Sequence, residues 1–263
     1  MNEKILNQIK SLPPLPKSVL EIQRITNDPN SSIADLIKIV KEDPMLTANL
    51  LKAANSPLYG FTRQIKNVDQ AVSLFGMSTV KGFAISFAIR NSLKFDLSAY
   101  GINETRFHDV ASQRNAIAIN WFKRDRTKLD VLATNSFLID VGAVVISLIL
   151  NNENKADSFK SRLLDGEERE KLEKEFIGAT TVEITTEIFK HWNFSEDLIE
   201  SMHNINNPSG KYQIESAALL VLKTLIDLIK PYNEENVKKA FEIAQNYNLD
   251  TDALQLSVEM VKG

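Results

Sequence analysis

The sequence predicts an all-α fold, and three observations support that prediction. Prolines crowd the first quarter of the chain, and after Pro57 none occurs until Pro208. Apolar residues recur at helical spacing through the proline-free stretch, as at Val110, Ile117 and Trp121. No stretch alternates apolar and polar residues as a half-buried strand would. We therefore expect a multi-helix bundle.

The composition is that of an ordinary globular protein, with 263 residues, 43% of them hydrophobic and 25% charged. The lack of cysteine excludes disulfides, thiolate zinc sites and thiol nucleophiles, and it fits a cytoplasmic location. A net charge of −3 gives no general attraction to nucleic acid or anionic lipid, so neither is an expected partner. The longest apolar run, 137–150, is shorter than the roughly 18–20 residues of a membrane span. Asp140 interrupts that run, which indicates a buried core helix and no membrane insertion.

Prolines and capping residues mark where the first helices begin. Pro16 suits a first helical position, and Ser32 can cap the helix that follows. Asp43 and Pro44 have the order of a cap and a first-turn proline, which opens another helix. Gly76 suits the left-handed residue that ends a further helix. This part of the chain is thus predicted to consist of short, well-delimited helices.

A softer boundary follows near residues 96–103, where glycine and polar residues interrupt the apolar pattern. Beyond it, the spacing of apolar residues predicts helices near 104–123, 128–151, 167–177, 179–193, 196–205, 213–230, 234–247 and 251–261. The polar stretch 151–166 is expected to be a loop with a short helix. The charged run 167–175 reads as a solvated helix face with i,i+4 ion pairs.

The most specific motifs lie near the N-terminus: Leu-Pro-Pro-Leu-Pro at 12–16, Asp-Pro at 43–44, and LLKAANSPLYG at 50–60. In this order and spacing they resemble the HDOD family of bacterial signalling proteins, named for the HD-related output domain. The resemblance covers nearly the whole chain. It implies one HDOD domain over 1–263, with an N-terminal helical subdomain (1–97) packed on an HD-like helical half (98–263). It also implies a non-catalytic signalling or scaffolding role.

In this resemblance, the residues that hold the catalytic ion of HD phosphohydrolases are largely replaced. The His-Asp pair stands here as Ile139-Asp140, and other histidine positions correspond to Thr181, Ile205 and Asn206. An HD centre needs several imidazoles together with a carboxylate. The resemblance therefore implies a dismantled site without metal or other cofactor. We expect a vestigial cavity lined by Leu138, Ile139, Asp140, Thr181, Ile205 and Asn206.

Asp140 is the one ligand that survives, and two hypotheses account for it. It is either a former ligand recruited to bind something else, or a core carboxylate held by Arg114, a helix cap or a buried water. An unpaired buried charge would be very costly, so a partner is required. The histidines that remain, His108, His191 and His203, lack the i,i+3 or i,i+4 spacing of a metal pair, and ordinary packing or surface roles are expected for them.

The segment 55–63 is a candidate interaction surface because it joins two helices and brings tyrosine, phenylalanine and arginine together. Tyrosine and arginine are among the residue types that dominate interface energetics. The candidates are Asn55, Ser56, Tyr59, Phe61 and Arg63. The alternative is that Tyr59 and Phe61 pack inward while Asn55 and Ser56 satisfy backbone groups of the turn.

A short basic cluster follows Trp121, formed by Lys123, Arg124, Arg126 and Lys128. Acidic residues interrupt the cluster, which favours a solvated helix connection over a phosphate or RNA contact.

The function we expect is that of a cytoplasmic, non-catalytic module that binds signalling proteins. A small ligand in the vestigial cavity is a candidate regulator of that binding. One alternative is a divergent metal-dependent phosphohydrolase that uses Asp140. Another is a nucleotide or cyclic-dinucleotide sensor, although the sequence shows no arginine-rich phosphate clamp.

Overall fold

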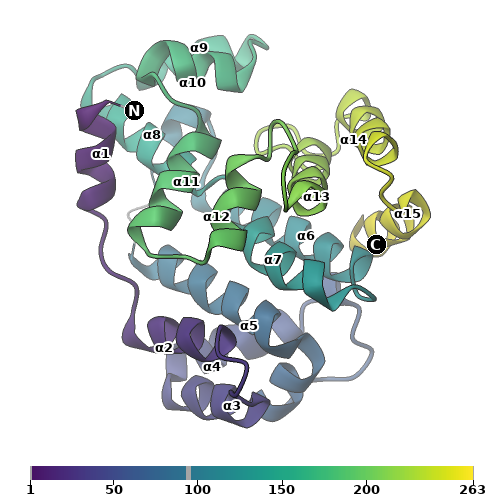
Figure 1. Ribbon diagram of the computed structural model, residues 1–263. Helices are drawn as coiled ribbons and strands as arrows, with labels where there is room; N and C mark the ends of the chain where they lie inside the picture. The colour runs from purple at the N-terminus through teal and green to yellow at the C-terminus, as the bar shows by residue number, and fades with distance from the viewer. Residues whose placement is uncertain (1, 93–95, 263) are drawn as a thin grey trace.

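The structure is a computed structural model that describes residues 2–92 and 96–262. Over these residues the chain forms helices and loops without any strand, which confirms the predicted all-α fold (Figure 1). In chain order the helices are α1 (Glu3–Lys10), α2 (Lys17–Thr26), α3 (Ile33–Glu42), α4 (Pro44–Ala54), α5 (Val68–Ser92), α6 (Glu104–Trp121), α7 (Arg126–Leu138), α8 (Val141–Asn152), α9 (Ala156–Leu164), α10 (Arg169–Ile177), α11 (Thr181–His191), α12 (Glu196–His203), α13 (Gln213–Leu225), α14 (Glu234–Asn246) and α15 (Thr251–Lys262). Two short 3₁₀ helices, η1 (Pro57–Tyr59) and η2 (Ser98–Tyr100), lie in the connections.

The predicted starts of α3 and α4 are confirmed by their caps, whereas Pro16 lies one residue before the first helical position of α2. The Ser32 side chain accepts a hydrogen bond from the Asp35 backbone N–H. The Asp35 carboxylate accepts one from the Ser32 backbone N–H, which completes a capping box. Asp43 caps α4 through the backbone N–H of Leu46, with a proline at the first helical position. Gly76 has φ 77° and ψ 170°, which is not helical, so the predicted helix end is present as a kink at which two helical segments of α5 meet.

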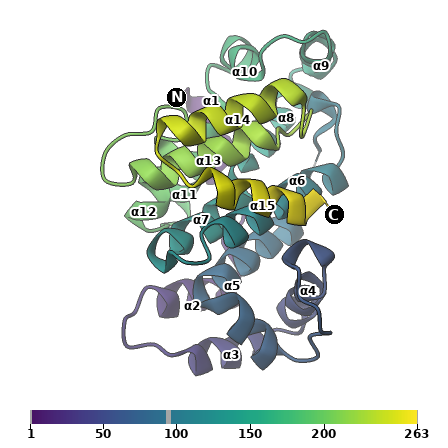
Figure 2. The same ribbon diagram turned by 90° about the vertical axis from the view of Figure 1, so that its right-hand side faces the viewer.

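Helix α5 is the centre of the N-terminal half. It packs against α2, α3 and α4, and against α7 of the other half (Figures 1 and 2). Gly82 allows α5 to approach α7 closely, because a β-carbon there would collide with the carbonyl oxygen of Ala133. Helix α1 departs from the expected grouping, since it packs on α8 and α11 of the HD-like half. The division of the domain after residue 97 stays a prediction. Helix α1 precedes that boundary in sequence but packs with the helices that follow it.

Two predicted helices are shorter in the structure. The expected helix 128–151 is broken between α7 and α8 by Ile139 and Asp140, the latter at φ −102°, ψ 13°. The expected helix 213–230 ends at Leu225, and Ile226 leaves helical geometry at φ −117°, ψ 71°. Both departures bring polar groups to one place, where Asp140 and the Ile226 carbonyl meet the same arginine. Tertiary contacts therefore override a continuous apolar pattern in both cases.

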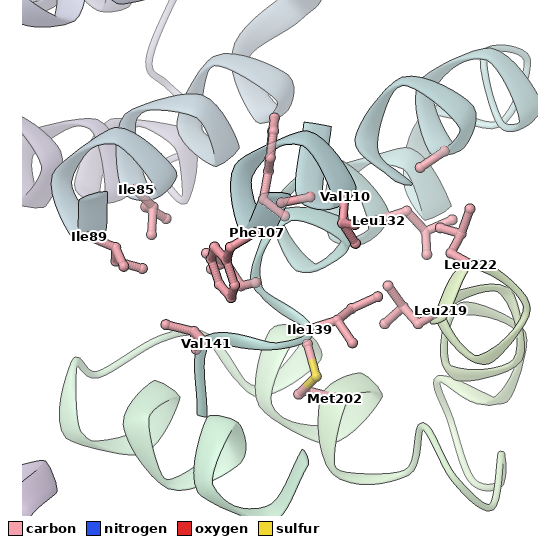
Figure 3. Close-up of a cluster of buried hydrophobic side chains, with 14 of the residues drawn as sticks. Ile85, Ile89, Phe107, Val110, Leu132, Ile139, Val141, Met202, Leu219 and Leu222 are labelled. Atoms are coloured by element: carbon pink, nitrogen blue, oxygen red, sulfur yellow. The ribbon is translucent and has the colours of Figure 1, made fainter. Parts of the chain in front are cut away.

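A single core of buried apolar side chains runs through both halves. Figure 3 shows part of it, where Ile85 and Ile89 of α5 face Phe107 of α6 and Val141 of α8. Two stretches of the described chain, 68–91 and 126–152, are long and apolar enough to span a membrane by composition alone. Their most apolar windows are 61% and 94% buried inside the fold, which is typical of core helices.

Candidate functional site

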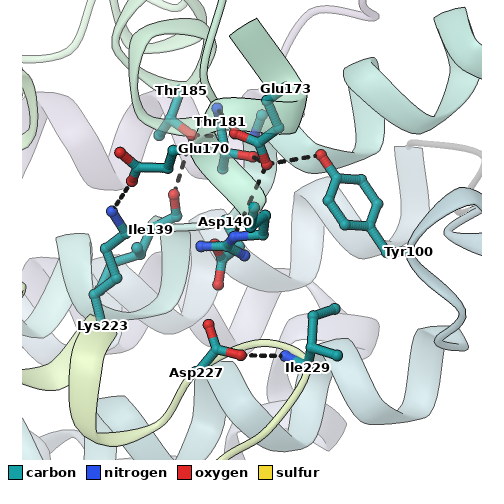
Figure 4. A network of polar contacts seen from close by, with 12 residues as sticks. Tyr100, Ile139, Asp140, Glu170, Glu173, Thr181, Thr185, Lys223, Asp227 and Ile229 are labelled. Carbon is teal, nitrogen blue, oxygen red and sulfur yellow. Dashed lines mark hydrogen bonds and ion pairs between the residues drawn. The ribbon is translucent and has the colours of Figure 1, made fainter. Parts of the chain in front are cut away.

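Asp140 lies at the corner between α7 and α8, and its carboxylate is held by two arginines (Figure 4). Arg114 Nη1 of α6 lies 2.5 Å from Oδ2, and Arg169 Nη1 of α10 lies 3.0 Å from Oδ1. Both carboxylate oxygens are thus paired with a guanidinium group. Of the partners considered from the sequence, Arg114 is confirmed, and Arg169 was not foreseen.

Arg114 is itself fully engaged, with 1% of its surface exposed. Its Nε and Nη2 donate to the carbonyl oxygen of Ile226 at 3.0 and 2.7 Å, and its Nη1 donates to Asp140. One side chain therefore ties α6 to the α7–α8 corner and to the turn that follows α13. Such a buried charge is tolerated because each of the three guanidinium nitrogens has an acceptor.

The ion pairs determine the protonation state of Asp140. Burial would raise the pKa of this carboxyl, but the charges of Arg114 and Arg169 outweigh burial and lower the pKa to about 2. Asp140 is therefore ionised throughout the physiological pH range, as a clamped anion.

A second carboxylate, Glu173 of α10, lies beside this clamp. It accepts from the Thr181 backbone N–H at 2.6 Å, from the Thr181 hydroxyl at 2.7 Å and from the Tyr100 hydroxyl at 2.9 Å. Arg169 Nε lies 3.9 Å from the same carboxylate. Burial raises the pKa of Glu173, and the three donors and Arg169 oppose that rise. Glu173 thereby joins α10 to the first residue of α11, where free backbone N–H groups favour an anion.

Lys223, Glu170 and Asn206 form a further set of polar contacts at the outer edge of these buried charges. The Lys223 ammonium of α13 contacts Glu170 and lies 2.7 Å from the Asn206 Oδ1 atom. Asn206 Nδ2 in turn donates to Glu170 at 2.9 Å, so the three side chains form a closed ring. We call Arg114, Asp140, Arg169, Glu173, Lys223, Glu170 and Asn206 the clamp network. The expectation that 167–175 is a solvated face is wrong for Arg169 and Glu173, which are nearly buried.

Several residues of the expected vestigial cavity lie near the clamp, but they are packed in the hydrophobic core. Leu138, Ile139 and Ile205 are buried apolar side chains, and the Ile139 carbonyl accepts from the Thr185 hydroxyl at 3.2 Å. Asn206 is exposed at the edge. Two pockets, of about 690 and 650 Å³, are lined by other residues.

These residues do not fit a catalytic metal ion. Both oxygens of Asp140 face guanidinium groups, and Ile139, Thr181, Ile205 and Asn206, which the resemblance aligns with histidines, have no imidazole to offer. Within residues 2–92 and 96–262, no three His, Cys, Asp or Glu side chains are grouped as metal ligands.

Part of the segment 55–63 packs inward or satisfies the turn, and part of it faces outward, so each of the two hypotheses holds for some of its residues. Asn55 is exposed but satisfies the turn, bonding the Ile65 backbone N–H and carbonyl at 2.9 Å each. Tyr59 is 7% exposed and donates to Asn115 Oδ1 at 3.1 Å, so it packs inward, as the alternative hypothesis has it, and is not part of an interaction surface. Phe61 is half-buried.

The outward-facing part of this segment is small. Arg63 is exposed, and Ser56 caps η1 by accepting from the backbone N–H of Leu58. Phe61 and Arg63 line the pocket of about 650 Å³, together with the half-exposed Leu74 of α5. The interaction prediction thus rests on Phe61 and Arg63.

Comparison with known proteins agrees with this architecture. A structure of a virulence factor from Campylobacter jejuni is 28% identical, with a TM-score of 0.61 over 98% of this chain and 96% of that one. A candidate phosphohydrolase from Shewanella amazonensis is 24% identical, with a TM-score of 0.69 over 99% of this chain and 94% of that one, which shows the shared fold. An uncharacterized Treponema pallidum protein is 29% identical over 82 residues, which make up 31% of this chain and 16% of that protein. The HDOD domain model matches residues 12–208, and the chain belongs to the HDOD family.

Proposed function

We propose that this HD-related module is a cytoplasmic signalling protein that acts by binding other proteins and does not hydrolyse phosphate esters. The observation that carries the second half of the proposal is the arginine clamp on Asp140. A metal ion at that carboxylate would have to displace Arg114 and Arg169, and both would then be left as buried charges. The positions that the resemblance aligns with histidines hold no imidazole, so none of them could bind the ion and offset this cost.

Metal analysis and a hydrolase assay test this half directly. Protein purified without tag or chelator is analysed for bound transition metals and assayed with bis-p-nitrophenyl phosphate in added Mn²⁺. We expect a metal ratio near zero and turnover equal to that of Asp140→Asn. A stoichiometric metal that Asp140→Asn loses, or turnover that depends on Asp140, would establish the divergent phosphohydrolase instead.

Partner binding is proposed for the outward part of segment 55–63. Phe61 and Arg63 support this, since an aromatic edge and an exposed guanidinium line one pocket. A photo-reactive amino acid at Gln64 in the full chain, expressed in its own cells, would identify the neighbour by mass spectrometry. Capture should fall in Phe61→Ala and Arg63→Ala and persist in Lys238→Ala on α14. Equal capture by all three variants would contradict the proposal.

Three cations give a specific reason to keep a second function, nucleotide or cyclic-dinucleotide sensing. Arg114, Arg169 and Lys223 come together around Asp140, although no clamp of this kind is visible in the sequence. A phosphate group that binds Lys223 would have to replace Glu170, which contacts that ammonium group. A thermal-shift screen with nucleotides tests this: a rise in Tm that Lys223→Met abolishes would favour the sensor, and an unchanged Tm would exclude it.

A further inference from the structure

Helix α1 stands apart from the helices that follow it in sequence, and the segment 11–16 leads from it to α2 (Figure 1). This segment lies outside the helices and has prolines at positions 13, 14 and 16. Pro16 has the extended geometry φ −54°, ψ 150°. Proline-rich segments of this kind are semi-rigid spacers. Helix α1 is therefore attached to the rest of the chain by an extended arm, and its position depends on its own contacts.

One short apolar stripe seats α1 on the HD-like half. Ile5 and Ile9, one turn apart, are 0% and 3% exposed, and the helix packs on α8 and α11. The other side chains of α1 are half-buried or exposed. An isolated helix shorter than about 12–15 residues is marginal in water, and α1 has eight residues. Helix α1 is therefore helical because it is docked, and undocking would unfold it.

The polar contacts between α1 and the HD-like half lie near the surface. The Asn2 amide group donates to the carbonyl oxygen of Ile177, the last residue of α10, at 3.1 Å. Lys4 pairs with Glu153, but the Lys4 side chain is 60% exposed, and exposed pairs contribute little stability. Glu153 also has a second partner, Lys155, at 2.7 Å. Water can replace these contacts when α1 leaves, so they oppose its release only weakly.

The first turn of α1 does not fill the groove in which it lies. A pocket of about 290 Å³ remains there, lined in part by Ile5, by Ile149 of α8 and by Phe176 and Ile177 of α10. Atoms that face such a space lack part of their packing contacts. Ile149 and Ile177 are 3% and 6% exposed with α1 in place. The groove thus has an apolar lining that α1 covers incompletely.

The groove adjoins the helices that the clamp network joins. Helix α8 begins directly after Asp140, and α10 carries Arg169 and Glu173. Helix α11 begins at Thr181, which donates to Glu173. A helix that enters or leaves this groove therefore contacts the same elements that hold the buried charges in place.

We propose that α1 is a removable cover. It leaves the groove while the rest of the chain stays folded, and the bare groove then binds a partner helix with the pattern of α1. That pattern is a capping residue, a cation two positions later, and apolar residues three and seven positions after the cap, as in Asn2, Lys4, Ile5 and Ile9. The occupant is defined by α1 itself, which the groove already holds. The inference rests on the proposed protein-binding function and gives it a second surface, which α1 blocks in the closed state.

Hydrogen exchange of the wild-type protein tests the opening. The backbone amides of α1 should exchange at least about a hundredfold faster than those of α8 and α11, because a local opening does not require global unfolding. Exchange of α1 as slow as that of α11 would overturn the inference.

Peptide binding, followed by fluorescence anisotropy, tests the groove. The probe is a fluorescent peptide of residues 2–12 with a hydrocarbon staple between the exposed positions 3 and 7. The full-length variant Ile5→Asp with Ile9→Asp should release its own α1 and bind the peptide about tenfold or more tightly than wild type, in which α1 competes. Asn7→Asp changes an exposed residue of the same helix and should bind like wild type. A peptide that carries the Ile5→Asp and Ile9→Asp substitutions should not bind the variant.

No peptide binding by the Ile5→Asp with Ile9→Asp variant, or binding equal to that of wild type, would overturn the inference. A variant that circular dichroism shows to be unfolded would overturn it too, because α1 would then be part of the core. The proposed function is separable. Capture of a partner at Gln64 that Phe61→Ala abolishes, without peptide binding, leaves partner binding standing and excludes the cover. Peptide binding without any capture at Gln64 supports the groove and removes segment 55–63 as the partner surface.

Discussion

The clamp on Asp140 makes a sharp prediction for Asp140→Asn, a change that keeps the shape of the side chain and removes its charge. The variant keeps one oxygen that can accept a hydrogen bond but removes the anion that neutralises Arg114 and Arg169, and its amide NH2 group faces one of the two guanidinium groups. Arg114 then retains the Ile226 carbonyl as acceptor, and Arg169 retains Glu173 as its anionic neighbour. If Asp140 were instead a ligand awaiting a metal, loss of its charge would cost little in the metal-free protein. The two readings therefore differ in the free energy of unfolding.

The magnitude follows from two independent arguments. The pKa of Asp140 falls from 3.8 to about 2, and this preference for the ionised form corresponds to about 2 kcal/mol. Breaking a buried ion pair by removing one partner costs about 3–5 kcal/mol, because the other charge stays buried. We therefore expect a loss of about 2–5 kcal/mol, or a fall in Tm of roughly 4–20 °C for a chain of this size.

Urea denaturation followed by circular dichroism measures this change. Asp109→Asn on the exposed face of α6 is the control and should lie within about 0.5 kcal/mol of wild type. Arg114→Met with Asp140→Leu should recover part of the loss, because apolar residues replace the pair. An Asp140→Asn variant as stable as the Asp109→Asn control would refute the clamp as a stabilising element.

Three further predictions follow from the same contacts. Because the pKa of Asp140 is depressed, its stabilising contribution is complete above about pH 4 and is lost as pH falls toward 2, so wild type and Asp140→Asn should converge in acid denaturation. Tyr59→Phe removes the donor to the buried Asn115 Oδ1 atom and should cost about 1–3 kcal/mol in urea unfolding, whereas an exposed Tyr59 would give no change. Gly142→Ala should cost about 3 kcal/mol or prevent folding, since its β-carbon would collide with the carbonyl of Thr181; normal expression and Tm would contradict this close approach of α8 and α11.

Local features of the fold were readable from the sequence, because their causes are local. The Ser32 capping box and the Asp43 cap each depend on residues within one helical turn, and both are present. The break at Asp140 was not readable, since apolar residues stand on both sides of the aspartate and neither glycine nor proline occupies position 139 or 140. It depends on Arg114, which lies 26 residues earlier in the chain.

The candidate site was likewise predictable only in part. The family pattern pointed to Asp140 and to Thr181, and both lie in the clamp region. Arg169 and Glu173 were missed, because a run of alternating charges at 167–175 looks the same whether its helix face is solvated or buried. One signal was available: the two are spaced i,i+4, and their face of α10 is shared with the apolar Leu172 and Phe176 at adjacent turns.

The clamp also accounts for a charged Asp140 in the core without any further ligand. In this chain Arg114 joins α6 to the α7–α8 corner, and Arg169 adds α10 to the same carboxylate. Two guanidinium groups thus supply the positive charge that Asp140 needs inside the core, where an unpaired anion would be very costly. The two arginines and Asp140 depend on one another, because either arginine without the carboxylate would be an unpaired buried charge. Restoring one histidine at Ile139 should therefore create no metal site, since the cations that neutralise Asp140 would still occupy it.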